Sequence, residues 1–193
     1  MIYPSTLNLT VLQDSTFEQD LVITEAAKAA TLNDATNVIT SACHGLVAGD
    51  RIAFAVSGGR LPCGIQATEN YFVLADGFTT GAFKISTSAG GSEVDFTILD
   101  TAATYEIGKI LNLTGYTFDA DIRSEFGGSL VGSLVCTVTS AVTGKLNLSL
   151  TAATTAALAA GVYLWDLKLK VPNVSSYFYA KGSFTVTATV SRD

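Results

Sequence analysis

Charged side chains are scarce in this sequence of 193 residues. Asp, Glu, Lys and Arg together make up 15% of it, whereas an average soluble domain carries roughly 25%. Because little charge repulsion opposes contact between such surfaces, the composition favours a subunit buried in an assembly over a free monomer. The net charge is −6, and nucleic-acid binding requires a basic footprint, so we expect no nucleic acid among its partners.

Cysteines and long apolar runs are also few. The three cysteines, Cys43, Cys63 and Cys136, never fall in a C-x-x-C spacing, which argues against zinc and thioredoxin-like sites. We expect Cys136 to be a core thiol, whereas pairing of Cys43 with Cys63 stays open. No run approaches the ~20 apolar residues that span a bilayer, and residues 1–10 lack the features of a signal peptide. We therefore expect synthesis in a reducing cytoplasm and no membrane partner.

Residues that could carry out chemistry are sparse as well. The only histidine, His44, precedes a Gly49-Asp50 turn, a setting that favours a turn cap over a general base. Neither a G-x-S-x-G nucleophile elbow nor a glycine-rich phosphate loop occurs. Asp119 and Asp121 share one face of a predicted strand, as a glycosidase or calcium site would need, but a solvated strand face explains them better. We predict no enzyme activity and no catalytic, cofactor-binding or metal site.

Alternation of apolar and polar residues dominates what is present. In Thr117–Arg123, for example, Phe118, Ala120 and Ile122 fall on one face and charged residues on the other. The same period of two recurs at 7–11, 134–139, 145–150, 163–170 and 184–190. Burial of a single face in several closely spaced strands is typical of antiparallel sandwiches and barrels. The sequence therefore predicts an all-β fold.

Three stretches depart from this pattern. The alanine-rich residues 151–160 predict one or two helical turns, ended by Gly161. Residues 25–35 are ambiguous between helix and irregular structure. Residues 36–106 carry glycine pairs that suit hairpin turns, and short strands are expected there at 38–41, 51–56, 71–74, 83–86 and 94–98. We interpret 36–106 as a separate small β module.

A further pattern, L-x-x-G-x-Y, leads into a predicted strand through Leu158, Gly161 and Tyr163. It resembles the tyrosine corner of immunoglobulin-like sandwiches, in which the tyrosine hydroxyl bonds to nearby backbone. The alternative is an ordinary buried tyrosine. Trp165 stands where antibody domains place a disulfide cysteine, so an apolar ring would fill the core in place of a bridge.

Short motifs in residues 44–86 carry a first family resemblance. They are His44-Gly45-Leu46 with Gly49-Asp50, Leu61-Pro62-Cys63-Gly64-Ile65, Tyr71-Phe72-Val73 and Phe83-Lys84-Ile85-Ser86. This stretch resembles a small β-barrel module common in bacteriophage structural proteins, which is similar to a domain of ubiquitin-activating enzymes.

A second resemblance rests on Leu113-Thr114-Gly115 before a strand, on Tyr163 with Trp165 and Asp166, and on a last strand that ends near Ser191-Arg192. It is to immunoglobulin-like domains of phage tail and baseplate proteins, including the N-terminal domain of upper-baseplate proteins. In those domains the first strand runs almost directly into the L-T-G strand, whereas residues 36–106 intervene here. The resemblance implies an immunoglobulin-like β-sandwich of residues 1–35 plus 107–193, interrupted by a small β-barrel insertion, 36–106.

Together the resemblances imply a bacteriophage virion structural protein of the tail, baseplate or fibre region, made in the host cytoplasm. Its partners would be other virion proteins and further copies of itself. Two alternatives stay open: a capsid decoration protein, and a receptor- or glycan-binding module that takes a host surface glycan. Tyr177, Phe178 and Tyr179 are the candidate contact surface, since three consecutive aromatic residues cannot all face one core. The other interpretation is that they pack against residues 36–106.

Overall fold

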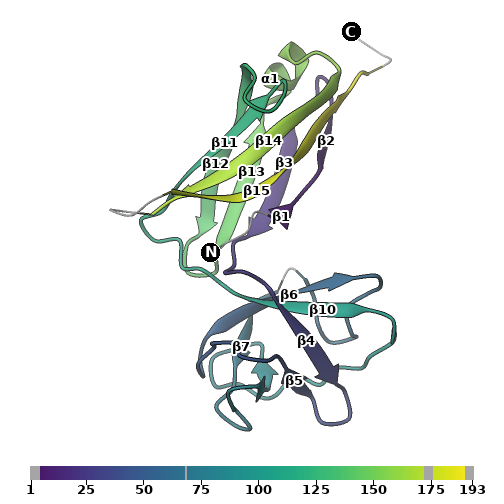
Figure 1. Ribbon diagram of the computed structural model, residues 1–193, viewed down its shortest axis with the longest axis vertical. Coiled ribbons are helices and arrows are strands. Elements are labelled where there is room, and N and C mark those ends of the chain that lie inside the picture. Colours follow the sequence, from purple (N-terminus) through teal and green to yellow (C-terminus); the bar gives the residue numbers. More distant parts are fainter. Residues whose placement is uncertain (1–4, 68, 172–175, 190–193) are drawn as a thin grey trace. The chain divides into compact units, whose positions relative to one another are not determined.

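The computed structural model describes residues 5–67, 69–171 and 176–189. The chain divides into two compact units, a first unit of residues 1–21 and 113–193 and a second unit of residues 22–112 (Figure 1). Strands supply nearly all of the regular structure, and α1 (Ala152–Ala157) is the only helix in the described ranges. The predicted all-β class is therefore confirmed. None of the described helical structure is long and apolar enough to cross a membrane.

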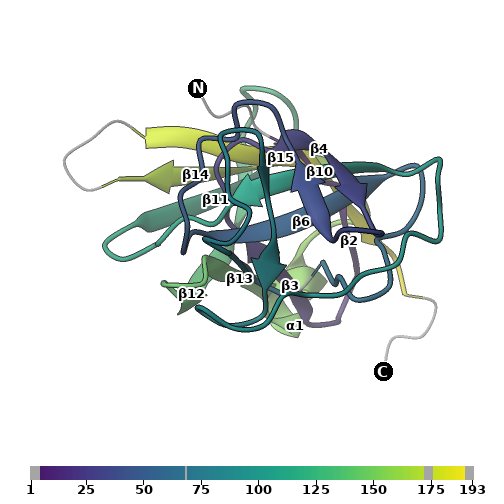
Figure 2. The same cartoon turned by 90° about the horizontal axis from the view of Figure 1, so that it is seen from below.

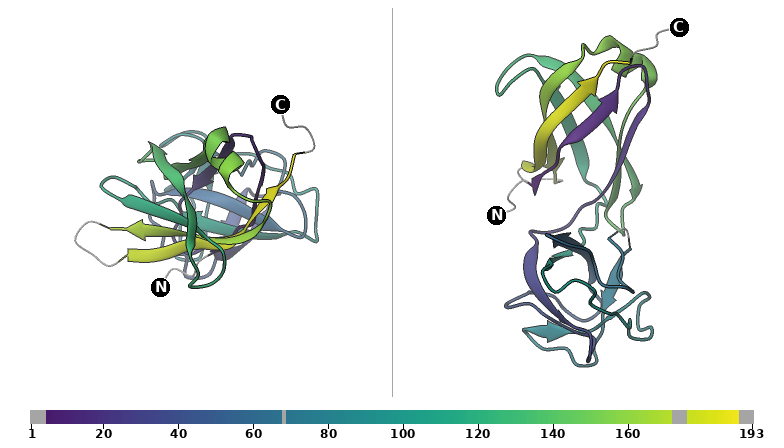
Figure 3. Two further views of the ribbon diagram at one scale, coloured as in Figure 1. Left: turned by 90° about the horizontal axis from the view of Figure 1, so that it is seen from above. Right: turned by 90° about the vertical axis from the view of Figure 1, so that its right-hand side faces the viewer.

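Eight strands of the described residues form the sheet of the first unit, in the order β1-β15-β14-β11-β12-β13-β3, with β2 also paired to β15. Their bounds are β1 (Ser5–Thr6), β2 (Leu9–Leu12), β3 (Phe17–Val22), β11 (Thr117–Arg123), β12 (Leu130–Ser140), β13 (Lys145–Leu150), β14 (Gly161–Lys170) and β15 (Ser176–Thr187). β12 pairs with β11 in its first half and with β13 in its second, so the sheet folds over into a β-sandwich. β1 and β2 run parallel to β15, and Figure 3 shows β2 beside it.

Alternating apolar residues of β13, β14 and β15 form much of the core of the first unit. Leu148, Leu167 and Phe184 are completely buried, and Trp165 is nearly so. The Trp165 indole N–H donates a hydrogen bond of 2.8 Å to the carbonyl of Leu7. The tryptophan therefore fills the core, as expected, and also holds the chain segment between β1 and β2.

The residues between β13 and β14 form the expected short helix. The hydroxyl of Thr151 caps α1 by accepting from the N–H of Thr154, 3.2 Å away. The helix ends at Ala157, earlier than Gly161, because Leu158 already has an extended backbone. The Tyr163 hydroxyl donates to the carbonyl of Ala159 at 2.8 Å, the upstream backbone bond that the tyrosine-corner pattern predicts. The immunoglobulin-like assignment of the whole sandwich stays a prediction.

Seven strands of the described residues form the sheet of the second unit, in the order β8-β5-β4-β10-β6-β7-β9. Their bounds are β4 (Lys28–Asn33), β5 (Val38–Thr40), β6 (Arg51–Ser57), β7 (Tyr71–Val73), β8 (Ala82–Phe83), β9 (Ile85–Ser86) and β10 (Thr104–Lys109). Figure 2 shows β4, β10 and β6 side by side, in agreement with their antiparallel registers. The sheet surrounds a core that includes Phe54, Tyr71, Phe83 and Phe96.

Several predicted boundaries differ from the structure. The ambiguous stretch contains β4, which pairs with β10, so residues 22–35 and 107–112 belong with the second unit rather than with the sandwich. Residues 94–98 form a single isolated bridge, between Thr97 and Cys63, instead of a strand. β15 ends at Thr187, Ala188 is exposed, and Val190 lies outside the described residues.

Position 182 requires glycine because the backbone between β1 and β2 passes close to it. A Cβ there would overlap the backbone carbonyl of Leu7, whereas a Cβ at Gly161 meets nothing. We expect Gly182→Ala to lower the free energy of unfolding by about 1–3 kcal/mol, because backbone must move to admit the methyl group. Urea denaturation measures the effect. Gly161→Ala is the matched control, and equal stability of the two variants would contradict this account.

Candidate functional site

A groove opens on the outer face of the first unit, with a volume of about 600 Å³. It lies over β11, β14 and β15 and beside the loop that follows β11. We call it the outer groove. Its lining residues are Thr6, Asp121, Arg123, Glu125, Phe126, Gly127, Leu164, Trp165, Asp166, Phe178, Lys181 and Gly182.

Strand register places the charged residues of the outer groove in one row. Asp166 on β14 lies directly opposite Asp121 on β11 and, on its other side, opposite Lys181 on β15. Leu164 lies opposite Arg123 in the next row. Successive side chains of a strand point to opposite faces of the sheet. The side chains of these rows therefore point outward, and their neighbours along each strand point into the core.

Three large apolar side chains are exposed around these charges. Phe126 is 97% exposed, Phe178 52% and Leu164 42%. Single exposed apolar residues are common on protein surfaces, but several that line one groove are typical of a contact site. The Lys168 ammonium lies 5.8 Å from the Phe178 ring centroid, within the range of a cation–π contact.

The two facing carboxylates of the outer groove differ in their partners. Asp121 accepts hydrogen bonds from Arg123 at 2.9 Å and from the Ser133 hydroxyl at 3.1 Å. Within the described residues, no hydrogen bond or ion pair reaches the Asp166 carboxylate. Partial burial, and secondly the charge of Asp121, raise the pKa of Asp166, while Arg123 and Lys168 oppose that shift. Asp166 therefore offers acceptor atoms to a cationic or hydroxyl-bearing ligand.

The structure separates the three aromatic residues of the predicted contact surface, Tyr177, Phe178 and Tyr179. Tyr177 lies opposite Leu169 and Phe178 opposite Lys168, and the register then shifts at a bulge, so that the next pair is Ala180 with Leu167. Of these three residues, Phe178 alone lines the outer groove, although Tyr177 is also 40% exposed.

Sequence reasoning missed Phe126, Leu164 and Asp166. Two signals were present. Phe126 is an aromatic residue in a glycine-containing turn, and Leu164 is an apolar residue in the polar phase of β14.

The other candidate residues have structural partners. His44 is buried: its Nδ1 accepts from the Leu46 N–H at 3.0 Å, and its Nε2 lies 2.9 Å from the Thr79 carbonyl and donates to it. Since backbone groups occupy both ring nitrogens, the turn-cap interpretation of His44 is confirmed. Asp119 forms an ion pair with Lys170 on the solvated strand face.

The described residues form neither a metal cluster nor a disulfide. No cluster of three or more His, Cys, Asp or Glu side chains that could hold a metal occurs in the described ranges. Cys43 and Cys63 are exposed free thiols, so the possible disulfide between them does not form. Cys136 is half-buried, and desolvation, with a smaller effect of Asp119, raises its pKa to about 11.

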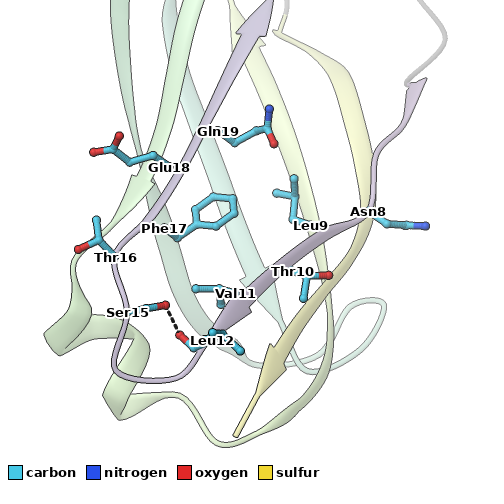
Figure 4. Close-up of a pocket in the computed structure, with 10 residues that line it drawn as sticks. All are labelled: Asn8, Leu9, Thr10, Val11, Leu12, Ser15, Thr16, Phe17, Glu18 and Gln19. Atoms are coloured by element: carbon cyan, nitrogen blue, oxygen red, sulfur yellow. Dashed lines mark hydrogen bonds between the residues drawn. The ribbon is translucent and has the colours of Figure 1, made fainter. Parts of the chain in front are cut away.

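A second opening, of about 290 Å³, lies between β2 and β3 (Figure 4). Residues 8–12 and 15–19 line it. Leu9, Val11 and Phe17 are buried, whereas Thr10, Leu12 and Glu18 are exposed. We call this opening the seam, because it separates two strands that are consecutive in the chain and are not paired with each other in the sheet order.

Comparison with protein-family models gives no match for this chain, and a search of curated proteins gives none either. Its functional interpretation therefore rests on the residues themselves.

We expect Cys136 to react with thiol reagents far more slowly than Cys43 and Cys63, because little of a thiol with a pKa of about 11 is ionised at pH 8. Titration with 5,5′-dithiobis(2-nitrobenzoate) should show two fast equivalents and one slow equivalent. The slow phase should accelerate as the pH rises, and it should vanish in Cys136→Ser. Three equivalents that react at one rate would contradict the burial of Cys136.

We expect Asp166→Asn to raise the free energy of unfolding slightly at pH 7, because the amide removes a charge that burial and Asp121 disfavour. Since the folded-state pKa is raised, the protonated carboxyl stabilises the fold at low pH and that stability is lost as the pH rises through this pKa. The variant and the wild type should therefore converge below pH ~3. Thermal unfolding across this range measures the difference.

Asp119→Asn is the control for this comparison. It breaks an ion pair with Lys170 and should give no gain in stability. Destabilisation by Asp166→Asn at pH 7 would show that the Asp166 charge is favourable in the fold.

Proposed function

We propose that this protein is a non-catalytic structural protein of a bacteriophage virion, in the tail, baseplate or fibre region, and that it works through contacts between subunits. The observation that carries the proposal is the outer groove, where Phe126 stands 97% exposed beside Phe178 and Leu164. A neighbouring subunit that covered these side chains would remove their apolar surface from water, at roughly 25 cal/mol per Å².

The motifs of the second unit support the resemblance on which the virion assignment depends. Besides the His44 cap, Asp50 accepts from the Val47 N–H at 2.8 Å and pairs with Lys109 at 2.8 Å. Gly64 has a φ of +98°, and a Cβ there would overlap the Asp95 carbonyl. His44, Asp50 and Gly64 thus form turns, as expected for a module whose shared residues maintain its fold.

A receptor- or glycan-binding module is a second candidate, and one observation favours it. Aromatic side chains and carboxylates converge in the outer groove, which is the combination that stacks against sugar rings and accepts their hydroxyl hydrogens. Glycan-array binding by the assembled protein would support this candidate, and the absence of binding would exclude the glycans on the array.

The virion assignment is tested by mass spectrometry of purified phage particles that carry this gene. We expect the protein in intact particles at a small multiple of three or six copies. Hundreds of copies would favour capsid decoration instead, and absence from particles would refute a virion role.

The contact role of the outer groove is tested by charge insertion. We expect Phe126→Asp to weaken subunit association at least tenfold, because it places a carboxylate beside Asp166 and Asp121 in the contact surface. Sedimentation velocity of the protein, alone and with neighbouring particle proteins, measures association. Leu99→Asp is the matched control, since Leu99 is 65% exposed and does not line the outer groove. Equal association of the two variants would refute the role of the outer groove.

A further inference from the structure

Within the described residues, the seam leaves two strand edges of the first unit open. The sheet order ends at β3 on one side and, through β15, at β1 and β2 on the other. Open strand edges present unpaired N–H and C=O groups, and proteins commonly blunt them by making edge strands very short. The outermost strands of the second unit, β8 and β9, have two residues each, whereas β2 has four and β3 has six.

The register of β2 fixes which backbone groups face the seam. The N–H groups of Leu7 and Gln13 donate to Lys181 and Thr187 on the β15 side, each at 2.9 Å. Because backbone groups alternate sides along a strand, those of Thr10 and Leu12 point the other way. The Leu12 carbonyl is already an acceptor for the Ser15 hydroxyl at 2.6 Å (Figure 4). Among the described residues, nothing bonds to the N–H and C=O of Thr10 or to the N–H of Leu12, so these groups remain for a further strand.

The turn that joins β2 to β3 is held in place by α1. The side-chain amide of Gln13 donates to the Leu158 carbonyl at 2.6 Å, and the Thr155 hydroxyl donates to the Ser15 carbonyl at 2.7 Å. Gln13 and Thr155 are both buried. These bonds position the turn from outside the seam, so the opening is a feature of the packed fold.

The charged residues of β2, β3 and the turn between them are all acidic. None of the residues that line the seam is basic, and the sequence has no Lys or Arg before Lys28. Asp14, Glu18 and Asp20 lie on or beside the two strands and are exposed. An acidic border of this kind attracts a basic segment and opposes a second copy of this chain, which would bring the same acidic edge and a net charge of −6.

We propose that the seam binds an extended, lysine- or arginine-bearing segment of another polypeptide, which adds as a β-strand between β2 and β3. Backbone bonds to Thr10 and Leu12 supply the affinity and register, and the acidic border selects basic side chains. This inference does not depend on the virion assignment, and it concerns a different surface from the outer groove.

The test uses the full-length protein and a fluorescein-labelled six-residue peptide in which valine and lysine alternate. Fluorescence anisotropy measures binding, and amide hydrogen exchange measures protection of Thr10 and Leu12. We expect saturable binding with slower exchange at both amides. The same peptide with glutamate in place of lysine should bind at least tenfold more weakly.

Two pairs of variants separate the backbone and charge contributions. Thr10→Pro removes a seam-facing N–H without removing a bond to β15, and should weaken binding at least tenfold, whereas Thr10→Val keeps that N–H and should bind like the wild type. Glu18→Lys should weaken binding several-fold. Glu125→Lys, the same change in the outer groove, should have no effect.

Three outcomes would overturn the proposal. In the first, neither Thr10→Pro nor Glu18→Lys changes peptide binding. In the second, the glutamate peptide binds as tightly as the lysine peptide, and in the third, the peptide binds without slowing amide exchange at Thr10. A loss of binding in Glu125→Lys alone would assign the peptide to the outer groove. Self-association abolished by Thr10→Pro would make a second copy the occupant. If Thr10→Pro fails to fold, Glu18→Lys and the exchange data still decide the question.

Discussion

The arrangement of the first unit depends on the contacts that hold the backbone at Leu7 against β14 and β15. The Trp165 indole binds the Leu7 carbonyl from the core side, and Gly182 lets that backbone approach closely. Because these contacts hold the segment between β1 and β2, both strands pair with β15, and neither of them pairs with β3. One packing arrangement, that of β1 and β2 on β15, therefore accounts for the buried Trp165, for glycine at position 182 and for the seam.

Much of the first unit could be predicted from sequence because one face of each strand is buried. Alternation in β11, β13 and β14 identifies these strands, and the Tyr163 bond follows from a local pattern of six residues, Leu158 to Tyr163. The membership of β4 could not be predicted in this way. Only Leu32 in that strand is buried, and its assignment depends on pairing with β10, more than seventy residues later.

The outer groove was harder to predict for a different reason. It is built from the outward phase of β11, β14 and β15, where sequence shows polar residues that suit any solvated surface. What distinguishes it is cross-strand placement, since Asp166 faces Asp121 only because of the register between β14 and β11. The bulge in β15 similarly directs Phe178 into the outer groove and shifts the register after it, which residue identity alone does not reveal.

The way in which the chain enters and leaves the second unit has a consequence for folding. Thr24 bridges to Ile110, and backbone bonds join Glu25 to Lys109 and Leu111 to Ile23, so the ends of this unit are tied together. The strands of the first unit that flank it would otherwise have to close a loop of about ninety flexible residues. If the second unit folds first, it brings Leu21 and Leu113 near each other. The strands of the first unit on either side then pair over a short effective distance along the chain, which speeds folding.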